Sequence, residues 1–452
     1  MTGTRRSASL ETSLFSRQGE EPVRRPTMLT VAAVAAFVLP VNAALAGPDR
    51  AGPEDRPTDI DLDVTQQVTE AARQASAQRQ AAPQGHGGPP LKGEEAAALD
   101  AATRQLADTE GTVGVTARVE GPDGVWRGAA GARELDRRPP ARPQDRFRVA
   151  SITKSMVATL VMQEVAAGTF TLDTPVNEVV PGMFPAHPDV TVEHLLSHRS
   201  GAQTGEGLVL ASRMSDPTDW EQFFQALGQD YGPQDYLSVV NAVPWLFEPG
   251  TDFSYSNAGY VALGLLLETV TGEDLADLLQ ERVFQPAGMR HTDYPVDPGT
   301  NGPFLVGAAW TGVPEDGGLG WQSLAGFDPD VFQAAGAAVS TTADLNAFTE
   351  ALITGELVDP ALVQDMVTPR SFEELDYGLG VYRLPDPCPA PGQEPWLYGH
   401  DGATFGTLSI ALTSADGSRQ LSIGVTGRDL TGATVPDLNS LLVPMLLASC
   451  EG

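Results

Sequence analysis

Strand patterns at the two ends of the chain, with a long helical region between them, constrain the fold of this sequence most. Near the start, residues 112–119 alternate as a strand does, and the turn 121–124 leads to a hairpin partner over 125–131. Strand patterns return late in the chain over 377–382, 396–400, 407–413 and 421–426. We therefore expect an α+β fold in which one antiparallel sheet, flanked by N- and C-terminal helices, is built from both ends of the chain and an inserted lobe is mainly helical.

The globular domain is predicted to span residues 94–452. Its sheet region is expected at 94–165 and 331–452, and its helical lobe at 166–330. About 350 residues are ample for one such core. The clearest helical patterns cover 94–109, 260–271, 275–283 and 435–448.

The first 46 residues have the pattern of an export signal. Two arginines precede an apolar run over 28–39, and small residues before Ala46 form a site at which signal peptidase would cut. The apolar run is too short for a comfortable membrane span. We expect a secreted protein cleaved after about Ala46, with residues 1–23 as an N-terminal extension.

The segment 47–93 is predicted to be a flexible acidic leader. It is rich in Pro, Gly, Ala and Gln and has almost no aromatic or β-branched residues, so it has little apolar surface to bury. Within it, 59–80 has the composition of a transient helix.

Charge and cysteine content narrow the possible partners. The chain carries 59 acidic against 28 basic residues, a net charge of −31, which excludes nucleic acid and anionic membranes as ready partners. We expect a monomer that binds a small-molecule or peptide substrate. Its two cysteines, Cys388 and Cys450, are an even pair in an exported chain and predict one disulfide that ties down the C-terminus.

A serine and a lysine three residues apart are the first sign of chemistry. If a helix begins near Ser151, its hydroxyl and the amine of Lys154 lie on one helical face and can meet. Among 28 basic residues only Lys92 and Lys154 are lysines, and a lysine can give up its proton where an arginine cannot. A Ser-x-x-Lys pair also arises by chance, so other stretches must decide.

Two further stretches complete a candidate site. In the loop 253–259, Tyr255 and Asn257 point the same way if the backbone is extended, so a phenol and an amide face one cleft. The amide can hold a substrate carbonyl. In the stretch 398–406, Gly402 lets a substrate approach the strand backbone that follows His400.

These three motifs together resemble the penicillin-recognising serine hydrolases. Ser151-x-x-Lys154, Tyr255-Ser256-Asn257 and His400-Asp401-Gly402 occur in the order and approximate separations of that family, in the branch of class C β-lactamases, D-alanyl-D-alanine carboxypeptidases and esterases. The resemblance covers roughly residues 95–450 and is supported by 195–201, 247–251, 340–344 and 377–380. A histidine in the third motif and a late cysteine pair resemble the secreted carboxypeptidases most.

The resemblance implies an acyl-enzyme mechanism without a cofactor. Ser151 would attack a carbonyl carbon while Lys154 and Tyr255 manage the protons. The backbone N–H groups of Ser151 and Ala403 would form the oxyanion hole, and Asn257 would hold the substrate amide.

The third motif departs from the family at its middle residue. There the family usually has threonine or serine, which helps to bind a substrate carboxylate, whereas this chain has Asp401. Facing the pocket, Asp401 would repel that carboxylate unless an arginine such as Arg383 compensates; facing away, it would anchor the strand. His400 would support the proton network.

Other functions remain open at this point. An esterase, an amidase or a class C-like β-lactamase would use the same machinery, and a non-catalytic peptide-binding module would keep the fold. The sequence lacks the Gly-x-Ser-x-Gly elbow of α/β-hydrolases. His194 and His198 have helical spacing, but Leu195 stands where a zinc peptidase needs glutamate, so we expect structural roles for both and no metal.

Overall fold

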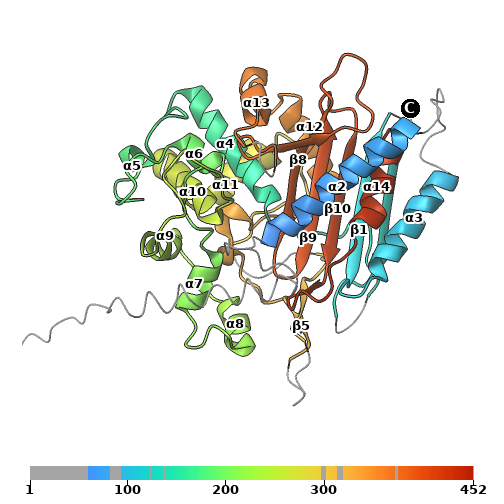
Figure 1. Ribbon diagram of the computed structural model, residues 1–452, viewed down its shortest axis with the longest axis horizontal. Helices are drawn as coiled ribbons and strands as arrows, with labels where there is room; N and C mark the ends of the chain where they lie inside the picture. The colour runs from blue at the N-terminus through green and yellow to red at the C-terminus, as the bar shows by residue number, and fades with distance from the viewer. Residues whose placement is uncertain are drawn as a thin grey trace, which may run out of the picture.

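A six-stranded antiparallel sheet forms the centre of the protein (Figure 1). The computed structural model describes residues 60–81, 93–122, 124–135, 139–296, 302–312, 319–371 and 375–450. The strand order is β2-β1-β10-β9-β8-β7, so two N-terminal strands pair with a block of four C-terminal strands in one sheet, which confirms the expected fold. The strands are β1 (Gly114–Gly121), β2 (Gly124–Gly131), β7 (Tyr382–Pro385), β8 (Trp396–Ala403), β9 (Thr407–Ser414) and β10 (Gln420–Thr426).

Helices cover both faces of this sheet. Three of them lie across the face turned to the viewer in Figure 1: α2 (Ile60–Ala81), α3 (Glu94–Ala107) and α14 (Asn439–Ala448). On the opposite face lie α4 (Ile152–Ala167) and α12 (Thr342–Ile353), packed on the central strands. Every residue of β9 and β10 is consequently buried, which explains their runs of small and β-branched side chains.

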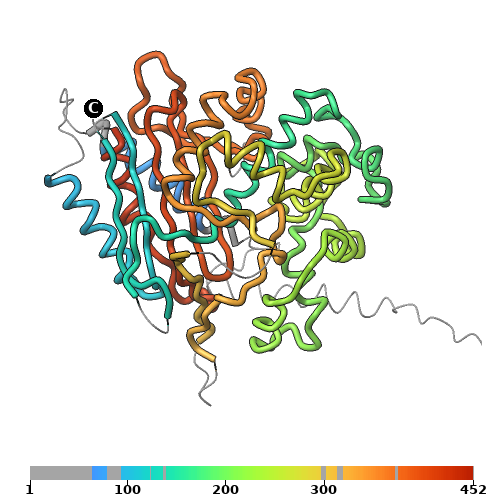
Figure 2. Tube along the Cα trace, turned by 180° about the vertical axis from the view of Figure 1, so that it is seen from behind, coloured from blue at the N-terminus to red at the C-terminus, as the bar shows by residue number. Residues whose placement is uncertain are grey.

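The remaining helices form a lobe beside the sheet. Figure 2 shows this division from behind, with the lobe at the right. Its elements are α5 (Val176–Val179), α6 (Val192–Leu196), α7 (Glu206–Ser212), α8 (Trp220–Ala226), α9 (Pro233–Asn241), α10 (Asn257–Thr271), α11 (Leu275–Leu279) and η1 (Gln280–Phe284).

Short elements join the lobe to the sheet layers. They are β3 (Phe147–Arg148), which pairs with β6 (Val339–Ser340), the small sheet of β4 (Ala308–Trp310), β5 (Trp321–Ser323) and β11 (Arg428–Asp429), the turns η2 (Pro329–Val331) and η3 (Gln333–Ala335), and the helix α13 (Pro360–Val367). Within the described ranges, no helix is both long and apolar enough to cross a bilayer.

The prediction of a flexible leader is wrong for residues 60–81. They form α2, whose small apolar side chains are buried in the main core; these are Val64, Val68, Ala71, Ala72 and Ala75. The composition was misleading because alanines at helical spacing allow a close approach to α14 even though each buries little surface. The rest of that leader, 47–59 and 82–92, and the predicted signal segment 1–46 lie outside the described residues.

The predicted strand over 377–382 is also wrong. Tyr377 and Tyr382 face each other across an isolated bridge, and β7 begins only at Tyr382. The chain turns because Gly380 has a φ of 76° and lies so close to α4 that a Cβ there would be 2.4 Å from the Cβ of Ala158.

Candidate active site

Ser151 stands at the junction between β3 and α4. The preceding residue, Ala150, has a φ of 49°, a conformation that residues with a Cβ rarely adopt. This sharp turn is held by two hydrogen bonds, from Val149 N–H to the Ala338 carbonyl (3.0 Å) and from the Thr153 hydroxyl to the Ala150 carbonyl (2.7 Å). It places Ser151 at the first turn of α4, where the helix dipole favours negative charge.

Lys154 is fully buried beside Ser151 and has three acceptors for its amine. Its Nζ donates to Ser151 Oγ (2.8 Å), Asn257 Oδ1 (2.6 Å) and the Ala335 carbonyl oxygen (2.9 Å). These contacts hold the amine in one position against the serine hydroxyl. Sequence reasoning missed Ala335, because a backbone carbonyl leaves no mark on residue type.

The second motif starts α10 beside the amine. Ser256 is the N-cap of this helix, and Asn257 is its first residue. Thr204 binds the first two N–H groups of α10, since its Oγ1 accepts the Asn257 N–H (3.3 Å) and its carbonyl accepts the Ala258 N–H (2.8 Å). The Tyr255 ring lies with its centroid 4.6 Å from Lys154 Nζ, within the range of a cation–π contact.

His198 lies just after α6, against Tyr255 of the candidate site. Its ring centroid is 4.0 Å from that of Tyr255, and its Nδ1 accepts the Ser256 N–H at 3.1 Å. Burial lowers the pKa of His198 well below its usual value, and the charge of Lys154 lowers it further. The ring is therefore neutral.

His194, the other member of the pair, caps a helix as expected. Its Nδ1 accepts the Thr191 N–H, and the Thr191 hydroxyl accepts the His194 N–H, which closes a capping box at the start of α6. Across the described ranges, no group of three or more His, Cys, Asp or Glu side chains is placed to hold a metal ion.

Gly402 brings the third motif into contact with the nucleophile. A Cβ at this position would lie 2.6 Å from the Val149 carbonyl oxygen and 2.7 Å from the Ser151 nitrogen. Only glycine allows β8 to approach so closely, and the next residue, Ala403, follows at the same end of the strand. The β7–β8 pairing runs only along Trp396–Gly399, so the site lies beyond the end of β7.

His400 lies beneath the site with both ring nitrogens hydrogen-bonded. Nδ1 contacts the Asp401 carbonyl oxygen and therefore carries the proton, so Nε2 accepts from the Tyr377 hydroxyl at 3.0 Å. Burial, reinforced by the Lys154 charge, lowers the pKa of His400 to about 3. Its ring centroid is 6.3 Å from that of Tyr255, so His400 adjoins the candidate site.

Asp401 faces away from the site. Its carboxylate accepts the Thr65 hydroxyl of α2, at 3.0 and 3.1 Å to the two oxygens, on the outer face of the sheet. Arg383 is occupied elsewhere, with Nε 2.9 Å from Asp376 and its guanidinium over the Trp396 ring. Of the two orientations open at the sequence level, Asp401 has the one that anchors the strand.

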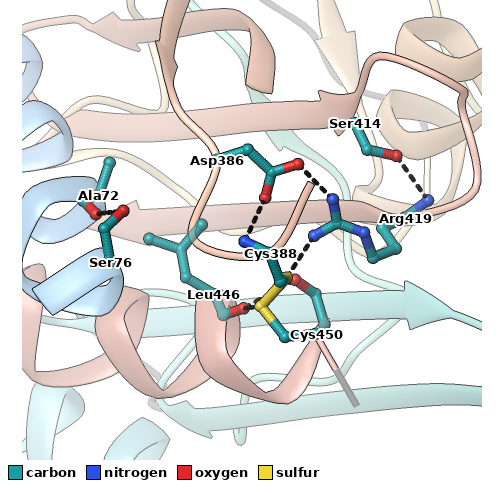
Figure 3. Close-up of a disulfide and its surroundings, with 9 residues drawn as sticks. Ala72, Ser76, Asp386, Cys388, Ser414, Arg419, Leu446 and Cys450 are labelled. Carbon is teal, nitrogen blue, oxygen red and sulfur yellow. Dashed lines mark hydrogen bonds and ion pairs between the residues drawn. A yellow bond between two sulfur atoms is a disulfide. The ribbon is translucent and has the colours of Figure 1, made fainter. Parts of the chain in front are cut away.

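The predicted disulfide is present (Figure 3). Cys388, in the β7–β8 connection, is bonded to Cys450, which follows α14. Arg419 forms an ion pair with Asp386 and donates to Cys388 Sγ at 2.9 Å, so the bond lies in a fixed polar setting. Figure 3 also shows Ala72 and Ser76 of α2 close by.

A serine held by a buried lysine, with an amide and a phenol beside them, defines the class of serine hydrolases that use a Ser-x-x-Lys pair. The family model for Beta-lactamase matches residues 99–426. The chain therefore belongs to the beta-lactamase family of serine hydrolases, as the resemblance implied.

Relatives within this family differ in their named activities. The chain is 34% identical to Esterase EstB of Burkholderia gladioli over 206 residues, which cover 43% of this chain and 50% of that protein. It is 27% identical to Penicillin-binding protein 4* of Bacillus subtilis over 277 residues, 59% of this chain and 58% of that one. The match therefore spans little more than half the length of these relatives.

A solved structure agrees over a larger share of the chain. A D-stereospecific amidohydrolase from Streptomyces is similar with a TM-score of 0.64 and 26% identity, covering 76% of this chain and 97% of that one.

Proposed function

We propose that this protein is an exported D-alanyl-D-alanine carboxypeptidase that acts on cell-wall peptides through an acyl-enzyme at Ser151. The observation that carries the proposal is the 2.8 Å contact of Lys154 Nζ with Ser151 Oγ, fixed by the further bond from Nζ to Asn257. Such a pair lets a serine hydroxyl lose its proton as it attacks.

The proposed reaction has two steps. Ser151 Oγ bonds to the carbonyl carbon of the penultimate D-alanine and its proton passes to the Lys154–Tyr255 pair. The oxyanion binds the N–H groups of Ser151 and Ala403, and the C–N bond breaks as the proton moves to the leaving amine. Water then attacks the ester, releases the shortened peptide and returns the proton to Ser151.

A terminal carboxylate is compatible with this site. Asp401 is turned to the outer face and does not oppose an anionic substrate. Arg428 Nη1 donates to the Thr404 carbonyl at 2.8 Å, so a guanidinium stands just past the end of β8, where such a carboxylate would approach. The similarity to a D-stereospecific amidohydrolase and to Penicillin-binding protein 4* also favours substrates with D-amino acids.

Esterase activity is the second candidate. It is favoured by the 34% identity to Esterase EstB, and an ester needs the same nucleophile with a better leaving group. An amidase or a class C-like β-lactamase would use the same groups. Turnover of acyl-D-Ala-D-Ala peptides, D-amino acid amides, nitrophenyl esters and cephalosporins, measured side by side, ranks these substrates.

Intact-mass labelling tests the proposal directly. The purified protein is treated with a penicillin, beside a Ser151→Ala control. A stoichiometric adduct that the control lacks supports the peptidase. A fluorophosphonate adduct without a penicillin adduct supports the esterase, and absence of both adducts would mean a non-catalytic peptide-binding module. N-terminal sequencing of the cell-free fraction tests export and cleavage after Ala46, and light scattering tests the monomer.

A further inference from the structure

Helix α2 packs against α14 and against the strands β7 and β8. Its buried side chains, Val64, Val68, Ala71, Ala72 and Ala75, share one helical face. At the α14 end, the side-chain oxygen of Gln67 accepts the Leu438 N–H at 3.1 Å. The helix is thus packed and hydrogen-bonded to two parts of the domain.

A polar contact between Thr65 and Asp401 connects this helix to the third motif. Thr65 is 8% exposed and Asp401 is 1% exposed, and the threonine hydroxyl lies within 3.1 Å of both carboxylate oxygens. A buried carboxylate is costly unless donors satisfy it, so this contact fixes the position of Asp401 strongly. Thr69, one turn later, only bonds back to the Thr65 carbonyl at 2.8 Å.

Asp401 lies on β8 between His400 and Gly402, the two residues of the third motif that face the candidate site. Side chains alternate along β8, so Asp401 faces α2 while His400 and Gly402 face α4. The carboxylate therefore holds the outer side of the same strand whose inner side rests against the Ser151 nitrogen.

We propose that α2 is a working part of the active site, and that Thr65, through Asp401, is a positioning residue that sets how closely β8 lies against Ser151. The distance between the N–H groups of Ser151 and Ala403, and hence the oxyanion hole, depends on that approach. The inference concerns the site of the proposed function but holds for any acyl group that the enzyme takes.

The test compares two threonines on one helix. Thr65→Val removes the hydroxyl that Asp401 accepts, Thr69→Val makes the same change without that contact, and Thr65→Ser restores the hydroxyl. The second-order rate of fluorophosphonate labelling at Ser151 reports the oxyanion hole and needs no natural substrate. We expect labelling to fall about tenfold in Thr65→Val, to stay within about twofold in Thr69→Val, and to recover in Thr65→Ser.

One outcome would contradict the inference, and a second variant covers the case in which the first does not fold. Equal labelling of Thr65→Val and Thr69→Val, with only the melting temperature lowered in the former, would overturn the inference and leave α2 as a stabilising element. If Thr65→Val does not fold, Thr65→Val/Asp401→Asn removes the buried charge as well. Slow labelling by this folded double variant supports the inference, and wild-type labelling contradicts it.

Hydrogen exchange separates this inference from the proposed function. Faster exchange of the 400–403 amides in Thr65→Val than in Thr69→Val supports the positioning role even if no reagent labels Ser151. Equal exchange contradicts that role. Failure of the wild-type protein to label at Ser151 would instead count against the proposed function.

Discussion

His198 and Tyr255 lie with their ring centroids 4.0 Å apart, tilted by 31°, while His198 Nδ1 accepts the N–H of Ser256. The His198 side chain therefore contacts the Tyr255 ring with its own ring and binds the Ser256 backbone through Nδ1. Because Tyr255 in turn lies over the Lys154 amine, we expect His198 to position Tyr255 for the proposed proton transfer.

Replacing His198 tests that relationship. We expect His198→Ala to lower kcat about 100-fold with little change in KM, because a small displacement of Tyr255 disrupts proton transfer more than binding. His194→Ala, a histidine four residues earlier that only caps α6, is the matched control and should retain activity within about twofold. Steady-state kinetics on the preferred substrate decides; equal losses in the two variants would assign His198 a structural role only.

Lys154 is expected to be indispensable. Lys154→Met should lower the rate of acyl-enzyme formation about 1,000-fold, because it removes the amine that lies 2.8 Å from Ser151 Oγ. Lys154→Arg should fare no better, since a guanidinium does not give up its proton. Burst kinetics measures acylation. Activity near the wild-type level in a folded Lys154→Met protein would exclude the amine as the base.

Gly402 is expected to tolerate no side chain. In Gly402→Ala the new Cβ would collide with backbone atoms of Val149 and Ser151, so β8 must move away and the oxyanion hole opens. We expect at least about a 100-fold loss of kcat. Gly326→Ala is the control, because a Cβ there meets nothing within 4 Å. Similar activities of the two variants would show that β8 can shift without cost.

Acid should destabilise the protein through its buried histidines. The folded-state pKa of His400 is about 3, whereas an unfolded histidine titrates near 6.5, so the unfolded chain binds the proton first as pH falls. The stabilisation is complete above about pH 6.5 and is lost towards pH 3, at up to about 1.4 kcal/mol per pH unit. Urea unfolding at several pH values across this range gives the free energy of unfolding as a function of pH. This free energy should depend less steeply on pH in His400→Gln than in the wild-type protein, and an equal pH dependence would contradict the prediction.

The disulfide is expected to contribute about 4 kcal/mol to the free energy of unfolding, because Cys388 and Cys450 are separated by 62 residues and the crosslink restricts the unfolded chain. Cys388→Ser/Cys450→Ser should lower the urea midpoint by the same amount as reduction of the wild-type protein. A double variant as stable as the oxidised protein would contradict the predicted contribution of the disulfide.

The sequence predicted the sheet well because its evidence is local. The alternation in 112–131 and the turn at 121–124 specify a hairpin within a few residues, and β1 indeed pairs with β2 through the partners Gly121 and Gly124. The motifs around Ser151, Tyr255 and Gly402 were also identified correctly as neighbours in space, although the roles assigned to them stay predictions.

The rest depended on contacts that have no local pattern. The Thr65–Asp401 pair joins residues 336 positions apart, and the alanine-rich sequence of α2 contains no pattern that predicts this contact. The Ala335 carbonyl and the ring contact of His198 were missed for the same reason. Gly380 misled the strand prediction because its φ of 76° ends the extended run that the apolar pattern favoured.

The pairing of β1 with β10 has a consequence for synthesis of the chain. Gly114 and Thr426 are partners although 312 residues separate them, so the β1–β2 hairpin, packed against the preceding α3, gains its next strand once β10 has left the ribosome. Two strands alone are marginally stable in water. The core must therefore close late, and nascent chains that stop before β10 should be bound by chaperones and cleaved by proteases that leave the finished protein intact.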